Sequence, residues 1–189
     1  MRLPVAPPPR ALPLRIKIYH AHQCDPKKCT GKRLIRAGQV EELPKVGTLR
    51  HSLFLDPFAQ TVLLSADLPI VDRIGLGLLD CSWQHASQEH EGRRFPNTRR
   101  LPLLVATNPI NFGKVGLLTT AEAVAASLRI LGERDAADLV LSRFKWGPHF
   151  LAINADLLQA YAEAPDQAGV DSIEQGTFGQ GGNLEMRAA

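Results

Sequence analysis

The feature that most constrains the fold of this chain is an apolar run that stops at a carboxylate. Residues 76–79 are Leu-Gly-Leu-Leu, and Asp80, Ser82 and Trp83 follow directly. Short apolar runs bounded by glycine are typical of buried strands. In open α/β sheets, ligands bind where strands end and loops or helices begin. We therefore expect the strand end at Asp80 to form part of a ligand site.

A second stretch, residues 101–120, repeats this pattern. Its sequence is LPLLVATNPINFGKVGLLTT, which predicts a strand over residues 101–105, then a loop rich in proline, glycine and asparagine, then a helix. Thr119 and Glu122 have the spacing of a capping box, so we expect the helix to begin there. We expect the two stretches to meet and to form one cofactor site.

Strands and helices interleave through the middle of the chain, which favours the α/β class. Further strands are expected over residues 14–19, 52–55 and 61–64, and helices over residues 65–74, 84–91, 119–132, 136–144 and 154–161.

The composition along the chain predicts four parts. A proline-rich arm is expected over residues 1–13 and a polar, disordered tail over residues 174–189. Between them we expect a small N-terminal α/β domain, residues 14–65, and a larger C-terminal domain, residues 66–173.

Charge on the whole chain does not point to a nucleic-acid partner, because 22 basic and 19 acidic residues leave a net charge of only +3. Basic residues are instead concentrated in two segments, 27–33 and 93–100, neither of which contains an acid. A charge run is usually a solvated face, but both runs lie beside expected strand ends, which favours contacts with phosphates.

Cysteine usage and hydropathy predict a cytoplasmic protein with no membrane partner. Three cysteines, an odd number, suit a reducing compartment better than a disulfide scaffold. No apolar run reaches the roughly 18 residues of a membrane span. Prolines interrupt the basic N-terminus, so it lacks the apolar stretch of a signal peptide.

The residues around the first strand end have alternative interpretations. Asp80 is either a base or ribose ligand, or a cap for the helix that follows. Trp83 is either a pocket wall or a core residue. Cys81 has no histidine at a spacing that indicates a catalytic pair.

Four residues near the N-terminus could bind zinc. His20, His22, Cys24 and Cys29 carry suitable ligand atoms. However, the spacing of the two cysteines lies at the edge of known zinc patterns, and no second pair follows. The alternative is a turn with reduced thiols, and we expect no metal.

Six segments, taken in order, resemble one known family, the small-subunit (16S/18S) ribosomal RNA aminocarboxypropyltransferases. The segments are CDPKKCTGKRL (24–34), SAD (65–67), DCSW (80–83), RLPLL (100–104), NPINFG (108–113) and FKWG (144–147). The resemblance covers roughly residues 15–173.

This resemblance implies a SPOUT-like C-terminal domain with a trefoil-knotted backbone that binds S-adenosylmethionine, and a smaller N-terminal domain that helps to hold RNA. The implied reaction moves the 3-amino-3-carboxypropyl group to ring nitrogen 3 of a uridine or pseudouridine, and leaves 5′-methylthioadenosine. Carried over by motif position, the cofactor contacts fall at Thr30, Leu79, Leu101, Gly116 and Thr120, several of them through backbone groups.

Further roles follow from the implied reaction. Asp80 is the candidate general base for the imide nitrogen, and Trp83 belongs to an apolar wall that faces the methyl group. The expected partner is small-subunit ribosomal RNA or a pre-ribosomal particle, bound by a monomer. The expected phosphate contacts are Lys27, Lys28, Lys32, Arg33, Arg99 and Arg100.

Two alternative functions remain open. One is an RNA methyltransferase of the SPOUT class that uses the same cofactor, which would yield S-adenosylhomocysteine instead. The other is a non-catalytic, RNA-binding ribosome-assembly factor. Family members tend to carry proline and an aromatic residue where this chain has Val115 and Gly116, and this departure keeps the second alternative open.

Overall fold

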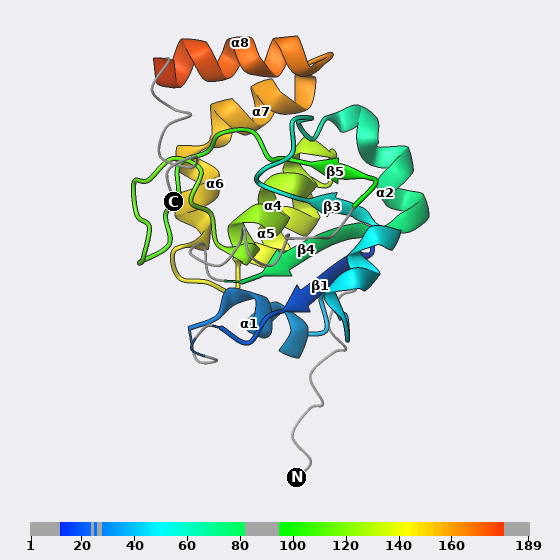
Figure 1. Ribbon diagram of the computed structural model, residues 1–189. Coiled ribbons are helices and arrows are strands. Elements are labelled where there is room, and N and C mark those ends of the chain that lie inside the picture. The colour runs from blue at the N-terminus through cyan, green and yellow to red at the C-terminus, as the bar shows by residue number, and fades with distance from the viewer. Residues whose placement is uncertain (1–11, 24, 26–27, 82–94, 180–189) are drawn as a thin grey trace.

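The computed structural model describes residues 12–23, 25, 28–81 and 95–179. Within these residues one five-stranded sheet forms, and every pairing in it is parallel. The strands are β1 (Ile16–His20), β2 (Glu41–Glu42), β3 (Leu53–Leu55), β4 (Leu76–Asp80) and β5 (Thr98–Arg99). Their order across the sheet is β2-β1-β4-β3-β5, with β4 at the centre (Figure 1). This is the mixed α/β fold that the sequence predicted.

Helices connect the strands and then follow them. Short 3-10 helices occupy Val46–His51 and Ser65–Asp67. The α-helices are α1 (Thr30–Arg36), α2 (Leu68–Ile74), α4 (Thr120–Ile130), α5 (Arg134–Leu141), α6 (Gly147–Ile153), α7 (Ala155–Glu163) and α8 (Gln167–Phe178). None of the described helices is long and apolar enough to cross a lipid bilayer.

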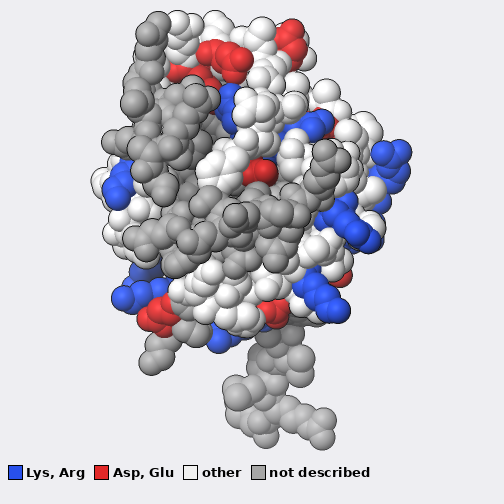
Figure 2. Space-filling model, in the orientation of Figure 1, with Lys and Arg blue, Asp and Glu red and all other residues white. Residues whose placement is uncertain are grey.

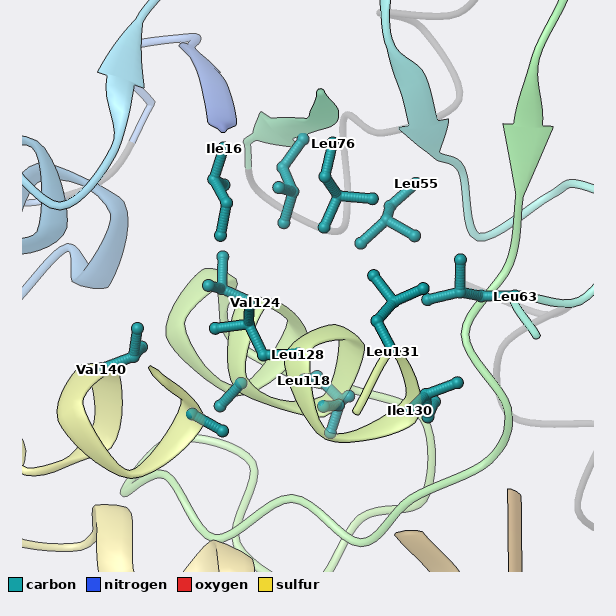
Figure 3. Close-up of a cluster of buried hydrophobic side chains, with 14 of the residues drawn as sticks. Ile16, Leu55, Leu63, Leu76, Leu118, Val124, Leu128, Ile130, Leu131 and Val140 are labelled. Atoms are coloured by element: carbon teal, nitrogen blue, oxygen red, sulfur yellow. The ribbon is translucent and has the colours of Figure 1, made fainter. Parts of the chain in front are cut away.

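The main hydrophobic core lies between the sheet and α4. Ile16, Leu55 and Leu76 point from their strands towards Val124 and Leu128 of the helix (Figure 3). Burial alternates along β1 because successive side chains of a strand face opposite ways. The core is therefore built by residues from nearly the whole described chain.

A smaller cluster covers the other face of the sheet. Leu43, Leu49 and Phe54 form it, and Phe95 packs against them. Since β1 and β3 both flank β4, a boundary near residues 64–66 would pass between strands of one sheet. The division into two domains stays a prediction.

Two expected strands are wrong. Residues 61–64 and 101–105 contribute only isolated bridges, Val62 with Arg100 and Val105 with Val115. Pro102 has no backbone N–H to donate to a ladder, and side chains bind this backbone instead, as described below.

The helices differ from the expected pattern at three places. Helix α1, which begins after Cys29, and helix α6 were not expected. The expected tail from residue 174 is helical up to Phe178, because Glu174 is buried and ion-paired with Arg100. The helix expected over residues 84–91 lies outside the described residues.

Candidate active site

A pocket of about 530 Å³ opens at the carboxyl ends of β3 and β4. Both stretches singled out in the sequence line it, so the expectation that they meet is correct. Five of the six residues expected at the cofactor line the pocket: Thr30, Leu79, Leu101, Gly116 and Thr120. Asp80, the candidate general base, lines it too, and Trp83, the sixth cofactor residue, lies outside the described residues.

Asp80 joins three elements at the base of this pocket. It is 6% exposed. Its Oδ1 accepts a hydrogen bond of 2.6 Å from the Thr120 hydroxyl, and its Oδ2 accepts one of 2.9 Å from the Cys29 thiol. A Cβ on Gly31 would lie 2.3 Å from Oδ2, so a glycine is needed where α1 approaches the carboxylate. Asp80 thus ties the starts of α1 and α4 to the end of β4.

His20 lies beside this carboxylate, and its tautomer follows from a backbone contact. The His22 N–H donates to His20 Nδ1 at 3.0 Å. In a neutral imidazole the proton is then on Nε2, which lies 3.5 Å from Asp80 Oδ2 and 3.3 Å from Cys29 Sγ. Burial lowers the pKa of His20, and this effect exceeds the opposing one of the Asp80 carboxylate.

The tautomer of His20 also determines whether this cluster is arranged to bind a metal ion. The ligand atoms of His20, Cys29 and Asp80 all lie within 4.8 Å of one another. A neutral histidine binds a metal through a nitrogen without a proton, whereas here Nε2, the nitrogen that faces the other two groups, carries the proton. The described geometry is therefore a hydrogen-bonded cluster, and not a preformed set of metal ligands.

The opposite wall of the pocket, residues 101–118, is held by side chains from distant helices. Leu103 N–H donates to Glu174 Oε1 at 2.8 Å, and the Tyr161 hydroxyl donates to Leu103 O at 3.0 Å. Asn154 binds both backbone groups of Val105, each at 2.9 Å. The Asn154 amide therefore does for this segment what a neighbouring strand does in a sheet.

Glu122 holds the next part of this wall, and it is fully buried. Its Oε1 accepts from the backbone N–H groups of Thr107 and Asn108 and from the Thr107 hydroxyl. Its Oε2 accepts from the Asn108 amide and from the N–H and hydroxyl of Thr119. The expected capping box is present, but the same carboxylate also fixes the loop that precedes it.

Gly116 and Thr30 complete the wall and its junction with α1. Gly116 has φ +80°, in the left-handed region that favours glycine, and its N–H donates to Leu104 O. The Thr30 hydroxyl accepts from Ala121 N–H at 3.3 Å. The hydroxyl groups of Thr30 and Thr120 are thus both hydrogen-bonded within the protein.

Most of the expected phosphate contacts already have partners within the chain. Arg99 makes a two-pronged contact with Asp67, at 3.0 and 2.8 Å. Arg100 binds Glu174 and Asp171.

The cations of the first basic segment differ among themselves. Lys32 pairs with Glu42 at 3.6 Å, and the Arg33 guanidinium lies 4.4 Å from the Phe144 ring centroid. Lys28 is exposed and lines the pocket, and Lys27 lies outside the described residues. On the face shown in Figure 2, Lys and Arg form several separate groups and not one continuous patch.

Sequence reasoning missed the residues that hold the second wall. Glu174 lay in the expected tail, Asn154 was only the first residue of an expected helix, and Glu122 was expected only as part of the capping box. The only signal for these residues was a polar side chain within an expected helix. Such side chains are common on the solvated faces of amphipathic helices, so they do not indicate a buried contact.

A parallel sheet with a pocket at the carboxyl ends of its strands defines a ligand-binding α/β protein. Comparison with known proteins narrows this class. The model of the family "Ribosome biogenesis protein, C-terminal" matches residues 53–178. A second model, "Possible Fer4-like domain in RNase L inhibitor", matches residues 14–45. Iron–sulfur clusters of the ferredoxin type are held by four cysteine thiolates, whereas the chain has three cysteines.

Similar proteins with names give the family. The 16S rRNA aminocarboxypropyltransferase of Methanothermobacter thermautotrophicus is 42% identical over 168 residues, which cover 88% of this chain and 99% of that protein. The enzyme of the same name from Methanocaldococcus jannaschii is 40% identical over 162 residues, 85% of this chain and 94% of that one.

A solved structure agrees with these relatives. The SAM-dependent rRNA:acp-transferase Tsr3 from Vulcanisaeta distributa superimposes with a TM-score of 0.76 at 37% identity, over 86% of this chain and 96% of that one. The chain belongs to the family of 16S rRNA aminocarboxypropyltransferases.

Proposed function

We propose that this protein transfers the 3-amino-3-carboxypropyl group of S-adenosylmethionine to ring nitrogen 3 of a uridine or pseudouridine in small-subunit ribosomal RNA. 5′-Methylthioadenosine is the second product. The observation that carries the proposal is the pocket in a member of this family, which is lined by five residues expected at the cofactor and by the candidate base Asp80.

The pocket fits the cofactor in size and in the chemistry of its lining. Its volume of about 530 Å³ lies within the range of small-molecule sites. Leu79 and Leu101 would lie against the nucleoside, Gly116 would allow a close approach because it lacks a side chain, and Thr120 would offer its backbone N–H at the start of α4. When bound, S-adenosylmethionine supplies carbons activated by a positively charged sulfur. The protein must therefore choose one carbon by position, and Trp83 remains the residue predicted to cover the methyl group.

Asp80 has two proposed roles, which one variant separates. As a proton acceptor it would take the imide proton, and Asp80→Asn would lower kcat by about 10²–10⁴-fold without changing cofactor affinity. Activity should then recover as rising pH removes the imide proton. As a positioning residue it would hold Thr120 and Cys29, and the variant would weaken cofactor binding without changing the pH profile. The hydrogen bonds to both carboxylate oxygens support the second role.

The proposed RNA contacts rest most firmly on Lys28, because it is exposed at the pocket. Lys27, Lys32 and Arg33 remain proposals on the same segment. Arg99 and Arg100 would have to exchange a carboxylate for a phosphate, so we propose them as the weakest contacts. Phosphate contacts predict an affinity for RNA that falls steeply with salt.

The test is incubation of the protein with small-subunit ribosomal RNA and cofactor labelled on its carboxyl carbon. Label in the RNA, with 5′-methylthioadenosine released, is the expected result. A methyltransferase would leave the RNA unlabelled and release S-adenosylhomocysteine. An assembly factor without activity would bind RNA and release neither product, and either of these results would overturn the proposal.

We also propose the finer features that the family resemblance implies. These are a SPOUT-like, trefoil-knotted backbone, an RNA-facing part over residues 14–65, a cytoplasmic location and a monomeric state. For the part over residues 14–65, the supporting observation is that the pocket takes residues from it as well as from the rest of the chain. A knot shortens the extended length of a chain pulled from its ends, which single-molecule force measurements detect. Sedimentation tests the monomer.

A further inference from the structure

The loop over residues 107–114 presents apolar side chains to solvent beside the pocket. Ile110 is 75% exposed and Phe112 is 65% exposed. Ile110 and Asn111 line the pocket, and Phe112 is the next residue of the same loop. In Figure 1 this loop belongs to the green connection between β5 and α4. Large apolar residues exposed together beside a site often mark an interaction surface.

Internal hydrogen bonds hold this loop in one conformation. Glu122 binds its first two residues, as described above. Asn108 Oδ1 accepts from the N–H groups of Ile110 and Asn111, at 3.1 and 3.0 Å. Gly113 has φ +78°, and its N–H donates to Ala106 O at 2.8 Å. The exposed side chains are therefore held in place before any partner arrives, which reduces the entropy lost on binding.

The chemistry of the surface fits an unpaired nucleobase. An exposed aromatic ring offers a flat apolar face, and proteins bind splayed bases of RNA by stacking on such rings. The Asn111 side chain could bind the edge of a base. Residues 101–118 contain no acidic residue, and Lys114 of the same loop is exposed, so this wall does not repel a polyanion. Asp25 and Asp56 line other parts of the pocket.

We propose that Phe112 stacks on an unpaired base of the substrate RNA next to the modified nucleotide, with Ile110 beside it. This inference rests on the proposed function, since it assigns a contact with the RNA that this function requires. It predicts that Phe112 contributes to RNA affinity and not to cofactor affinity.

The test compares three variants of Phe112 in the full chain. Phe112→Ala should raise the KM for small-subunit ribosomal RNA that lacks the aminocarboxypropyl group but keeps its pseudouridines by about 10-fold, which corresponds to about 1.4 kcal/mol and lies within the range for stacking of one base. Phe112→Leu should show a similar loss, because it keeps the bulk without the ring, and Phe112→Trp should bind as the wild type does. Cofactor affinity, measured by calorimetry, should be unchanged in all three.

A spectroscopic signal distinguishes stacking from a structural effect. A base stacked on the indole of Phe112→Trp should quench its fluorescence on addition of RNA, beyond any change in the wild type. Ile153→Ala is the matched control, because Ile153 is 48% exposed but does not line the pocket; it should leave the KM unchanged.

Other outcomes have distinct meanings. If Phe112→Ala keeps the wild-type KM and Phe112→Trp shows no added quenching, the stacking proposal is wrong. If Phe112→Ala acts normally on naked RNA and fails only on a pre-ribosomal particle, the surface binds a protein, which also overturns it. If the wild-type protein itself neither binds nor modifies the RNA, it is the proposed function that fails.

Discussion

The two walls of the pocket are built in different ways. On one side, β4 is paired along its whole length with β1, and the ladder carries Asp80 to the edge of the sheet. On the other side, residues 101–105 have no ladder, and Glu174, Tyr161 and Asn154 bind their backbone. The first wall is supported by backbone groups that any sequence possesses, and the second depends on particular side chains.

This difference determines how each wall responds to substitution. A ladder survives most changes of side chain, because its hydrogen bonds join backbone atoms. A backbone N–H that relies on one carboxylate or amide loses its partner when that side chain is removed, and an unpaired buried group is costly. The second wall should therefore be the more sensitive of the two, and four measurements test this contrast.

The largest effect is expected for Glu122→Ala. It would leave the buried donors of Thr107 and Asn108 and the partly buried donors of Thr119 without their acceptor, and should lower the free energy of unfolding by about 3 kcal/mol or more. Glu122→Gln keeps one acceptor and should lose less. Urea denaturation measures both, with Glu163→Ala at the exposed end of α7 as a control expected to change stability by less than about 0.5 kcal/mol. Equal losses for Glu122→Ala and the control would contradict the role given to Glu122.

Asn154→Ala should come next, with a loss of about 2 kcal/mol. The variant removes both bonds to Val105 and the bond to Phe150 O. Because Val105 lies within the second wall, cofactor affinity should fall together with stability. Unchanged cofactor affinity in a destabilised variant would show that the pocket does not depend on this contact.

Tyr161→Phe should have a smaller effect, about 1 kcal/mol at neutral pH, because it removes the hydrogen bond to Leu103 O. Burial, with a further contribution from Glu174, raises the pKa of Tyr161. Folded Tyr161 thus keeps its proton where an unfolded tyrosine loses it, so wild-type stability should fall as pH rises above about 10. Tyr161→Phe has no phenol to titrate, so the difference in the free energy of unfolding between the two proteins should narrow above this pH. A difference that stays constant up to a pH of about 11 would contradict the raised pKa of Tyr161.

The smallest effect is expected for His20→Gln, beside Asp80 in the first wall, which should make the pH dependence of stability less steep. The folded protein keeps His20 neutral because burial lowers its pKa. Unfolded histidine takes up a proton below about pH 6.5, so wild-type stability should decline as pH falls from about 7 to 5. His20→Gln should decline less over this window in urea titrations. Identical slopes would mean that His20 does not contribute to the pH dependence.

Elements with local signals were predicted well. The run before Asp80 forms β4, and the Thr119–Glu122 spacing marks the start of α4. Residues 101–105 were wrongly expected to form a strand because an apolar run looks alike whether a ladder or side chains bind its backbone. The start of α1 was missed because Cys29, whose thiol accepts from Lys32 N–H, is not a common helix cap.

By itself, the sequence determined the α/β class, the end of the central strand at Asp80 and the family, because each is indicated by short motifs and local patterns that can be read one after another along the chain. Only the tertiary structure decided how the pocket is held. Glu174 lies 71 residues from Leu103, and Asn154 lies 49 residues from Val105. No local pattern indicates that a carboxylate or an amide will replace a strand partner, because the choice is made by the packing of helices that follow much later in the chain.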